Sequence, residues 1–328
     1  MGSVDWFFPA DMEQALAQLR DGDSQAVAGG TSLLDLFKLG HPLRRRLVDL
    51  SRLPLKEITS DDRTISIGAL ASNTAVAQSR LVQSECPALS QAILLGASQQ
   101  IRNAASVGGN LLQATRCVYF RTPDWRCNRR APGSGCEAQT APLPSHAVLG
   151  GSTSCIAVNP SDLAVALLAL DATVVATTSD NTVERIGMKD FYPLPGATPH
   201  VTSALPPGAL ITSVEIPRSR LTKRSGYSKL RGRASYEFAT ASVAAAVEMD
   251  GAIVSRVAVA LGGIATRPWR LAAAETILTG KTIHPAAVDE FCDLLLRDAD
   301  ARAATRHKVS MVRGAVHRLL THLARPDR

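Results

Sequence analysis

Residues 28–34 read Ala-Gly-Gly-Thr-Ser-Leu-Leu, and residues 106–111 read Ser-Val-Gly-Gly-Asn-Leu. The first glycine pair stands between a predicted strand at 25–28 and a predicted helix at 33–39. Glycine lacks the Cβ atom that would keep a diphosphate away from the main chain, and the amides at a helix start attract anions. Either pattern alone is also typical of an ordinary tight turn. Two of them in one chain indicate a site for both ends of a long dinucleotide.

Helical and extended patterns alternate around these two motifs. The strand patterns lie at 47–50, 64–68, 173–178 and 211–216. The helical spacings lie at 11–20, 75–80, 88–95 and 163–170, the last preceded by a capping sequence at 159–162. This alternation predicts a domain built from small α/β subdomains.

A polar, basic linker at 217–224 is expected to close this domain. Beyond it, extended patterns at 226–230, 241–249 and 253–261 predict three antiparallel strands, and helical patterns follow at 285–296 and 308–323. The predicted fold class is therefore α+β, with an antiparallel sheet and helices forming the C-terminal domain.

Four of the six cysteines fall in a segment without periodicity, between 113 and 155. They are Cys117, Cys127, Cys136 and Cys155, and nine, eight and eighteen residues separate them. Structural zinc sites and ferredoxin-type runs use closer spacing, so the pattern indicates four ligands for a metal that it does not specify. Cross-linking by a metal would order a long loop that has no core of its own.

The other candidate metal ligands carry less weight. His146, beside Pro144, is expected on the surface, with replacement of one cysteine as the alternative. Cys86 and Cys292 lie in apolar helical patterns and are expected to be buried hydrophobic side chains.

The net charge of +7 does not indicate a nucleic-acid-binding protein, because the basic residues are spread out and aromatic residues make up only 4%. One concentration lies among the cysteines. Its members are Arg116, Arg121, Arg126, Arg129 and Arg130. They are expected to offset the negative charge of a thiolate-bound centre, or to form a solvated loop that meets an acidic partner.

Several other classes are not supported. No segment has the roughly 20 apolar residues of a membrane span, and the N-terminus lacks the basic region of a secretory signal. We therefore expect a cytoplasmic protein, or a periplasmic one exported with a partner that bears a twin-arginine signal. Residues 133–138 match the Rossmann glycine pattern, but neither a strand nor a helix flanks them. No catalytic triad pattern is present.

Long segments of the chain resemble the flavin subunits of the xanthine dehydrogenase and carbon monoxide dehydrogenase family. The two glycine motifs resemble the FAD-holding loops, within AGGTSLLDLFK and ASVGGNLLQ. The resemblance continues through NPSDLAVALLALDA, ALITSVEIP, YSKLRGRASYEFATASVA and LGGIATRPWR. The cysteine-bearing segment resembles the insertion that carries a [4Fe-4S] cluster in the flavin subunits of bacterial periplasmic aldehyde oxidoreductases.

The resemblance implies a role for individual residues. The FAD pyrophosphate would contact the first loop, which comprises Val27, Ala28, Gly29, Gly30, Thr31, Ser32, Leu33 and Leu34. Ser32 stands where the family often has Asp or Asn. The second loop would contribute Ser106, Gly109 and Asn110. Asp162 would bind the adenosine or ribitol region, Ile211 would touch the ring region, and Lys229 would lie near the isoalloxazine. The [4Fe-4S] ligands would be Cys117, Cys127, Cys136 and Cys155.

The same resemblance implies the domain organisation and the function. Residues 1–218 would form an FAD-binding domain of the vanillyl-alcohol-oxidase type with residues 114–156 as the iron–sulfur insertion, and residues 224–328 the C-terminal domain. The protein would pass electrons through FAD to an external acceptor. Because the cofactors would perform the redox chemistry, the chain would contribute no acid, base or nucleophile. Its partners would be a molybdopterin-binding large subunit that oxidises an aldehyde and a small subunit with two [2Fe-2S] clusters. The alternatives are the flavin subunit of a 4-hydroxybenzoyl-CoA reductase-like enzyme and a zinc-stabilised interaction protein without flavin.

Overall fold

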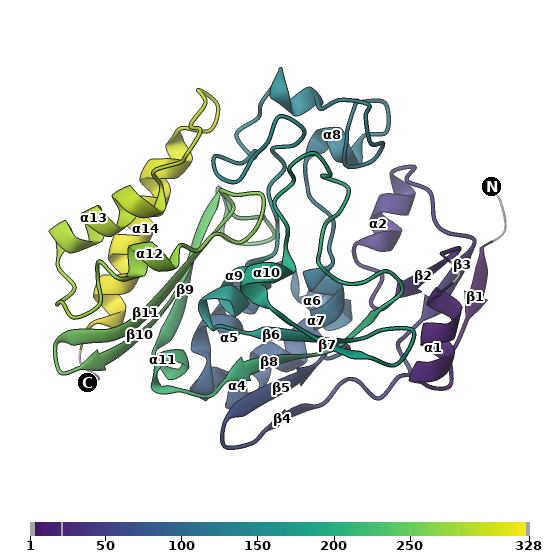
Figure 1. Ribbon diagram of the computed structural model, residues 1–328, viewed down its shortest axis with the longest axis horizontal. Helices are drawn as coiled ribbons and strands as arrows, with labels where there is room; N and C mark the ends of the chain where they lie inside the picture. Colours follow the sequence, from purple (N-terminus) through teal and green to yellow (C-terminus); the bar gives the residue numbers. More distant parts are fainter. Residues whose placement is uncertain (1–3, 21, 326–328) are drawn as a thin grey trace.

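The computed structural model describes residues 4–20 and 22–325. Three β-sheets follow one another across the molecule (Figure 1). The predicted α+β class is confirmed, because a mixed helix-and-sheet part precedes a C-terminal antiparallel sheet that carries helices. Among the described residues, none of the helices has both the length and the apolar composition to cross a bilayer.

The first sheet is parallel and has the strand order β1-β3-β2. Its strands are β1 (Asp5–Phe7), β2 (Ser24–Val27) and β3 (Arg46–Asp49), and its helices are α1 (Met12–Leu19) and α2 (Leu33–Lys38). Asp11 caps α1 by accepting a hydrogen bond from the Gln14 amide. The helix buries Leu16 and Leu19 in a small core that includes Val48 of the central strand.

The second sheet is antiparallel, in the order β4-β5-β8-β6-β7. Its strands are β4 (Ile58–Ser60), β5 (Thr64–Gly68), β6 (Thr173–Thr177), β7 (Val183–Gly187) and β8 (Leu210–Pro217). The predicted strands at 64–68, 173–178 and 211–216 are confirmed as β5, β6 and β8. The chain leaves the sheet after β5 and returns about a hundred residues later as β6. Strand β8 then lies between β5 and β6.

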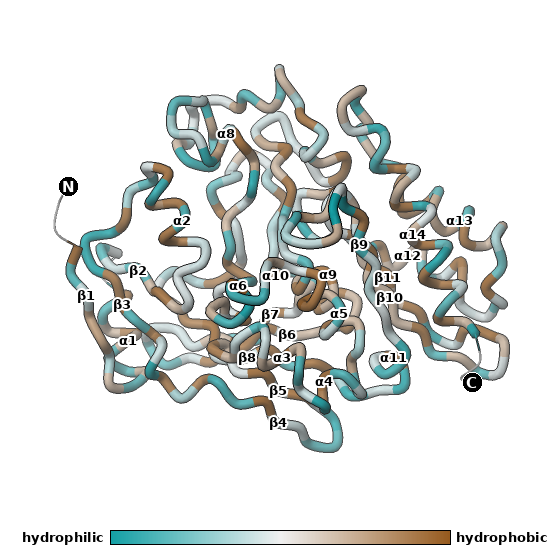
Figure 2. The backbone as a smooth tube through the Cα atoms, turned by 180° about the vertical axis from the view of Figure 1, so that it is seen from behind, coloured by the Kyte–Doolittle hydropathy of each residue, from teal (hydrophilic) through white to brown (hydrophobic). Residues whose placement is uncertain are grey.

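That excursion begins with a helical layer. It contains α3 (Asn73–Gln78), α4 (Arg80–Glu85), α5 (Pro87–Leu95), α6 (Gln99–Ala104), α7 (Val107–Leu111) and, after the cysteine segment, α9 (Asp162–Ala169). Helix α9 is buried on all sides except at its first residue, and Figure 2 shows it among the most hydrophobic segments. Helix α10 (Met188–Phe191) follows β7.

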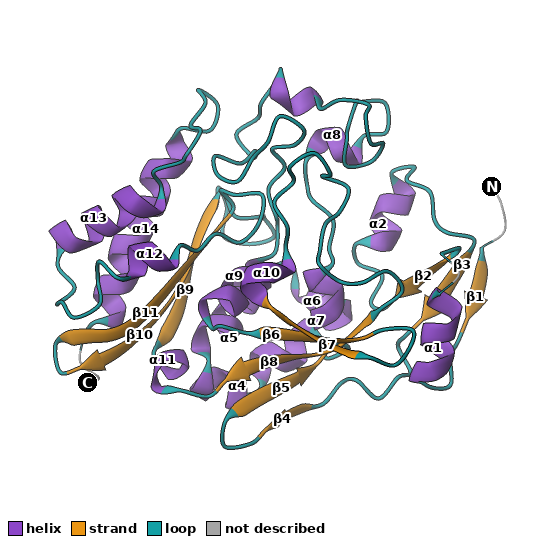
Figure 3. Ribbon diagram, viewed as in Figure 1, coloured by secondary structure: helices purple, strands orange, loops and turns teal. Residues whose placement is uncertain are grey.

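The cysteine segment has almost no regular structure, as its sequence predicts. Only α8 (Val118–Arg121) and a 3₁₀ turn at Glu137–Gln139 interrupt the loops that stand out from the sheets (Figure 3). A single antiparallel bridge pairs Cys127 with Cys136, and another pairs Ser152 with Cys155. We call residues 114–156 the insertion, with the bounds that the resemblance implies.

The third sheet has the order β11-β10-β9 and is antiparallel. Its strands are β9 (Ser225–Leu230), β10 (Ala241–Asp250) and β11 (Ile253–Gly262), and its helices are α12 (Ala272–Glu275), α13 (Pro285–Leu295) and α14 (His307–Leu323). The segment expected to be a linker is ordered, because α11 (Arg220–Lys223) has a capping box between Ser219 and Thr222.

Strand β10 is buried on both faces. Its alanines Ala244 and Ala246 join the core that contains α9, whereas Val243 and Val247 join the core that contains α14. Alanine on the α9 side lets the helix approach closely, and a Cβ atom placed on Gly262 of β11 would meet Val165 of α9 at 2.5 Å. The C-terminal sheet is therefore packed firmly against the helices of the excursion.

Candidate functional site

The first glycine turn is shaped by the packing of the chain itself. Strand β2 ends at Val27, and a Cβ atom placed on Gly29 would lie 1.8 Å from the carbonyl oxygen of Ala104. Gly30 has a φ of +68°, in the left-handed region that favours glycine. Close approach of another backbone segment at Gly29, and not only room for a ligand, therefore requires the first glycine.

This turn leaves main-chain donors free. Among the described residues, the amides of Thr31, Ser32 and Leu33 have no hydrogen-bond acceptor, since the first bonds of α2 come from Leu34 and Leu36. Ser32 occupies the N-cap of α2, but its side chain does not cap the helix. Three neighbouring N–H groups without partners form a cradle for an anionic group such as a diphosphate.

The second glycine turn works differently. Its amides are already used, because Val107 and Gly108 donate to the carbonyls of Ala71 and Ala69, while Gly109 donates to the Ser106 hydroxyl. The expectation that main-chain amides of both turns are available is therefore correct for the first turn only. What the second turn offers is the side chain of Asn110, whose oxygen accepts from Gln113 Nε2 at 2.9 Å and from the Ser161 hydroxyl at 2.7 Å.

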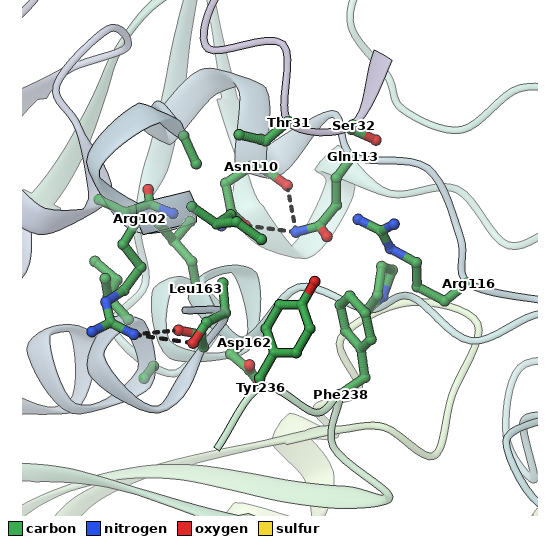
Figure 4. Close-up of a pocket in the computed structure, with 18 of the residues that line it drawn as sticks. Thr31, Ser32, Arg102, Asn110, Gln113, Arg116, Asp162, Leu163, Tyr236 and Phe238 are labelled. Carbon is green, nitrogen blue, oxygen red and sulfur yellow. Dashed lines mark hydrogen bonds between the residues drawn. The ribbon is translucent and has the colours of Figure 1, made fainter. Parts of the chain in front are cut away.

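Two cavities meet where the two turns face each other. One, of about 420 Å³, extends toward Leu210 and Ile211, and the other, of about 490 Å³, extends toward α9 and the C-terminal sheet (Figure 4). Thr31, Ser32 and Gly109 line both. The free amides of the first turn thus lie at the junction of the two cavities. This arrangement matches a dinucleotide, in which a diphosphate joins the two nucleotide halves.

All the predicted flavin residues except Leu34 line these cavities. The cavity of about 420 Å³ is lined by Val27, Ala28, Gly29, Gly30, Leu33, Ser106 and Ile211. The cavity of about 490 Å³ is lined by Asn110, Asp162 and Lys229. Leu34 is 38% exposed, and its side chain covers Gly30 from outside.

Asp162 and Lys229 are bound to each other at the wall of the larger cavity. Lys229 Nζ lies 2.7 Å from Asp162 Oδ2 and also donates to the Leu95 carbonyl, while the Tyr227 hydroxyl donates to Asp162 Oδ1 at 2.5 Å. Burial raises the pKa of the Asp162 carboxyl, and the Lys229 ammonium and Tyr227 hydroxyl oppose that shift. Both oxygens of Asp162 are engaged within the protein.

The larger cavity includes polar residues that the sequence did not single out as flavin contacts. Asn73 Oδ1 and Arg116 Nε are buried and have no hydrogen-bond partner among the described residues. The Arg116 guanidinium lies 4.8 Å from the centre of the Phe238 ring and 2.9 Å from Asp35 Oδ2. Figure 4 shows Arg116, Tyr236 and Phe238 close together at one end of the cavity. Unsatisfied buried polar atoms in a cavity fit a polar ligand.

The four cysteines of the insertion converge. All are free thiols; Cys117, Cys127 and Cys155 are buried, and Cys136 is partly buried. Burial raises the pKa of Cys117 to about 11, the amides of Phe120 and Tyr119 lower it, and the nearby Cys127 and Cys155 raise it further. Burial likewise raises the pKa of Cys136, with Cys155 and Cys127 adding to the shift and the Ala138 and Gln139 amides opposing it.

Four thiols are a donor set suited to a zinc ion or to an iron–sulfur cluster. Within residues 4–20 and 22–325, no three His, Cys, Asp or Glu side chains lie close enough to hold a single metal ion. Amides directed at the sulfur atoms, such as the Ala157 amide 3.4 Å from Cys155 Sγ, stabilise thiolates.

Most of the basic residues of the insertion contact groups other than the cysteine sulfur atoms. Arg116 and Arg121 pair with Asp35, and Arg126 pairs with Glu137. Arg130 donates to the carbonyls of Tyr119, Phe120 and Pro123, which fixes the loop. Among the described residues, Arg129 is the one member of this group with a contact to a cysteine sulfur, at 4.0 Å between Nη2 and Cys155 Sγ. A charge-offset role for Arg129 stays a prediction.

His146 is not at the surface, contrary to expectation. It is 1% exposed, and its Nε2 lies 3.4 Å from Cys117 Sγ. Burial lowers the pKa of His146 to about 4, and Lys308 and Arg302 lower it further. No sequence spacing indicates this burial, because Lys308, which donates to the His146 carbonyl, lies 162 residues away. Cys86 and Cys292 are buried hydrophobic residues, as predicted.

Comparison with known proteins decides the family. Residues 2–219 match the FAD binding domain in molybdopterin dehydrogenase. The chain belongs to this FAD-binding family of the molybdenum hydroxylases. Residues 226–323 match the CO dehydrogenase flavoprotein C-terminal domain.

Relatives agree with this assignment. The chain is 44% identical over 296 residues to the aldehyde oxidoreductase FAD-binding subunit of Escherichia coli (strain K12), covering 87% of this chain and 92% of the relative. It is 24% identical over 319 residues to the carbon monoxide dehydrogenase medium chain of Hydrogenophaga pseudoflava, covering 95% and 94%. These relatives are subunits of oxidoreductases, and the resemblance to flavin subunits drawn from the sequence is confirmed.

Solved structures confirm the fold. The reconstituted CO dehydrogenase from Oligotropha carboxidovorans superimposes with a TM-score of 0.77 at 22% identity, covering 98% of each chain. Quinoline 2-oxidoreductase from Pseudomonas putida 86 gives a TM-score of 0.74 at 22% identity, covering 98% of this chain and 97% of the other.

The match to the FAD-binding family excludes the alternative of a zinc-stabilised interaction protein without flavin.

Proposed function

We propose that the chain is the electron-transfer subunit of a molybdenum-containing aldehyde oxidoreductase, with FAD between its two glycine turns and a [4Fe-4S] cluster on its four insertion cysteines. Electrons from molybdopterin and [2Fe-2S] centres on partner subunits would leave the complex here, for an external acceptor. The aldehyde as substrate is supported by the 44% identity to an aldehyde oxidoreductase subunit over most of both chains.

One observation carries the pairing of two redox groups. Arg116 lines the larger cavity, and the next residue, Cys117, belongs to the converging thiols. A small cavity of about 60 Å³ lies between the larger cavity and these thiols, and its lining includes Cys117, Asp162 and Phe238. Flavin and cluster would therefore be neighbours, separated by a thin wall of side chains.

The two cavities support a proposal for where the two ends of the dinucleotide lie. FAD supplies reversible transfer of one or two electrons when bound. The free amides of Thr31, Ser32 and Leu33 would hold the diphosphate at the junction. The smaller cavity is lined by Leu50, Leu210 and Ile211, which suits a stacked adenine. The larger cavity has Lys229, Asn73 and Arg116, which suit the polar edge of the isoalloxazine.

For Ile211 we propose a different place from the one that the resemblance implies. Ile211 and Lys229 were both expected beside the flavin ring, but they line different cavities on either side of the junction. A ring confined to one of these cavities would not contact both residues. We therefore place Ile211 against the adenine, keep Lys229 near the isoalloxazine, and place Asp162 behind Lys229 as its counter-ion.

The test is anaerobic mixing of the purified complex with an aldehyde while the flavin absorbance is followed. Bleaching of the flavin band by aldehyde, and its return when an acceptor is added, are the expected results. Bleaching of the iron–sulfur absorption of the partner subunits without any change in the flavin band would contradict electron exit through this chain. Reaction with 4-hydroxybenzoyl-CoA and none with aldehydes would favour the reductase alternative.

A further inference from the structure

His146 is held between one donor and one acceptor. Its Nδ1 lies 2.8 Å from the amide nitrogen of Leu143, and its Nε2 lies 3.4 Å from Cys117 Sγ. The amide can only donate, so Nδ1 must be the accepting nitrogen of the imidazole. The ring proton is consequently on Nε2, and it points at the cysteine sulfur.

The C-terminal domain fixes the position of this imidazole. Lys308 of α14 is fully buried, and its ammonium donates to the carbonyls of His146 at 2.8 Å and Gly263 at 2.7 Å. The imidazole also stacks on the Tyr119 ring, with centroids 5.9 Å apart and planes inclined by 21°. Both the backbone and the ring of His146 are therefore held, and rotation away from Cys117 would leave the Leu143 amide unpaired.

We infer that His146 is a positioning and tuning residue for the cluster, whose neutral imidazole donates its Nε2–H to the sulfur of Cys117. The inference rests on the proposed function, because it requires that Cys117 ligate iron. A hydrogen bond to a ligating sulfur withdraws electron density from it and favours the reduced cluster. Lys308 lies in the C-terminal domain and donates to the His146 carbonyl. This domain therefore also helps to position the imidazole.

The direct test is pulsed electron paramagnetic resonance of the reduced cluster in the whole complex, prepared with ¹⁵N-labelled histidine. A weak ¹⁵N coupling, with an exchangeable proton coupling that disappears in D₂O, is expected. A strong nitrogen coupling would mean that His146 is itself an iron ligand and would overturn the inference, as would the absence of any coupling. If the complex lacks this cluster altogether, the proposed function fails along with the inference.

Variants give a second readout. His146→Leu removes the donor, whereas His146→Gln keeps an N–H group of similar reach. With iron content unchanged, the Leu variant should lower the midpoint potential, so that about tenfold less cluster is reduced at a given ambient potential, which is about 59 mV for a one-electron couple. The Gln variant should stay closer to the wild type. Equal potentials in wild type and both variants would overturn the inference.

His41 provides the matched control. Its ring also touches the insertion, through the Arg121 carbonyl at 3.3 Å and the Phe120 ring at 5.1 Å, but it contacts no cysteine. His41→Leu should leave the potential of the cluster and the ¹⁵N coupling of His146 unchanged. A shift equal to that of His146→Leu would show that loosening the loop, and not loss of the hydrogen bond, sets the potential.

Discussion

The ammonium group of Lys229 lies 2.7 Å from Oδ2 of Asp162, and the two side chains are 1% and 10% exposed. Asp162 begins helix α9 of the flavin-binding part, and Lys229 lies on strand β9 of the C-terminal sheet. The pair thus joins the two parts of the chain at the wall of the larger cavity. The Lys229 side chain is oriented by Asp162 and by the Leu95 carbonyl before any ligand arrives.

Removing both members of this pair should lower the free energy of unfolding by less than the sum of the two single removals. Asp162→Asn or Lys229→Met leaves the other charge buried without its partner, so each should lower the free energy of unfolding by about 3–5 kcal/mol. The double variant leaves neither charge and should lose less than the sum, by about 1–3 kcal/mol. Urea unfolding of the full-length chain measures the three values. Strict additivity would show that the two side chains do not interact.

Gly29 should tolerate no side chain. Gly29→Ala would place a Cβ atom 1.8 Å from the Ala104 carbonyl, so it should cost about 3 kcal/mol, the upper end for overpacking, and reduce the flavin content. Gly133 is the control, since it has a φ of +85° and no atom near its Cβ position. Gly133→Ala should cost only the backbone strain of about 1–2 kcal/mol and keep the flavin. Equal flavin content in both variants would argue against the first turn as the diphosphate site.

The four insertion cysteines should be needed for iron and not for flavin. Serine at Cys117, Cys127, Cys136 or Cys155 should remove the four-iron content of this subunit, because the site loses a thiolate. The flavin should remain, since these residues line neither of the two large cavities. Iron and FAD analysis of the purified complex measures both.

Cys86→Ser controls for the loss of a buried thiol. Burial and Glu85 raise the pKa of Cys86 to about 12, so it is a protonated thiol and not a ligand. Its serine variant should keep all the iron. Full iron in every insertion variant would refute the cluster assignment.

Lys308 should make stability rise with pH in the alkaline range. Burial lowers its pKa to about 8, below the value of about 10.4 in the unfolded chain. Between these values the unfolded state binds more protons, so the free energy of unfolding should increase with pH, by at most about 3 kcal/mol. Lys308→Met should lose this rise, whereas Met at the exposed Lys281 should keep it. Parallel pH profiles for wild type and Lys308→Met would contradict the assignment.

The parts of the fold that the sequence predicted are those with strong local periodicity. Strands β5, β6 and β8 alternate or are uniformly apolar and were predicted within a residue or two. Helix α6 has no fully buried residue, and β1 and β4 are three-residue strands with exposed side chains, so hydrophobic spacing gave no signal for them. Only pairing with neighbouring strands defines the two strands.

The residues of the site also differ in whether local sequence could indicate their roles. The glycine turns and the cysteines are local in sequence, so their chemistry was recognisable. The roles of Asn73, Arg116 and Phe238 depend on segments that are far apart in the chain and meet only in the larger cavity. His146 was expected at the surface because it lies beside Pro144. Its burial depends on Lys308 and Tyr119, which no sequence spacing connects to it.

The most direct test of the central claim is a cryo-electron microscopy map of the whole purified complex at a resolution that shows the cofactor. We predict a diphosphate within hydrogen-bonding distance of the Thr31 and Ser32 amides, with the isoalloxazine on the Lys229 side of Gly109 and the adenine on the Ile211 side. A complex with all its subunits but no density at this junction, or with flavin bound elsewhere in the chain, would contradict the account.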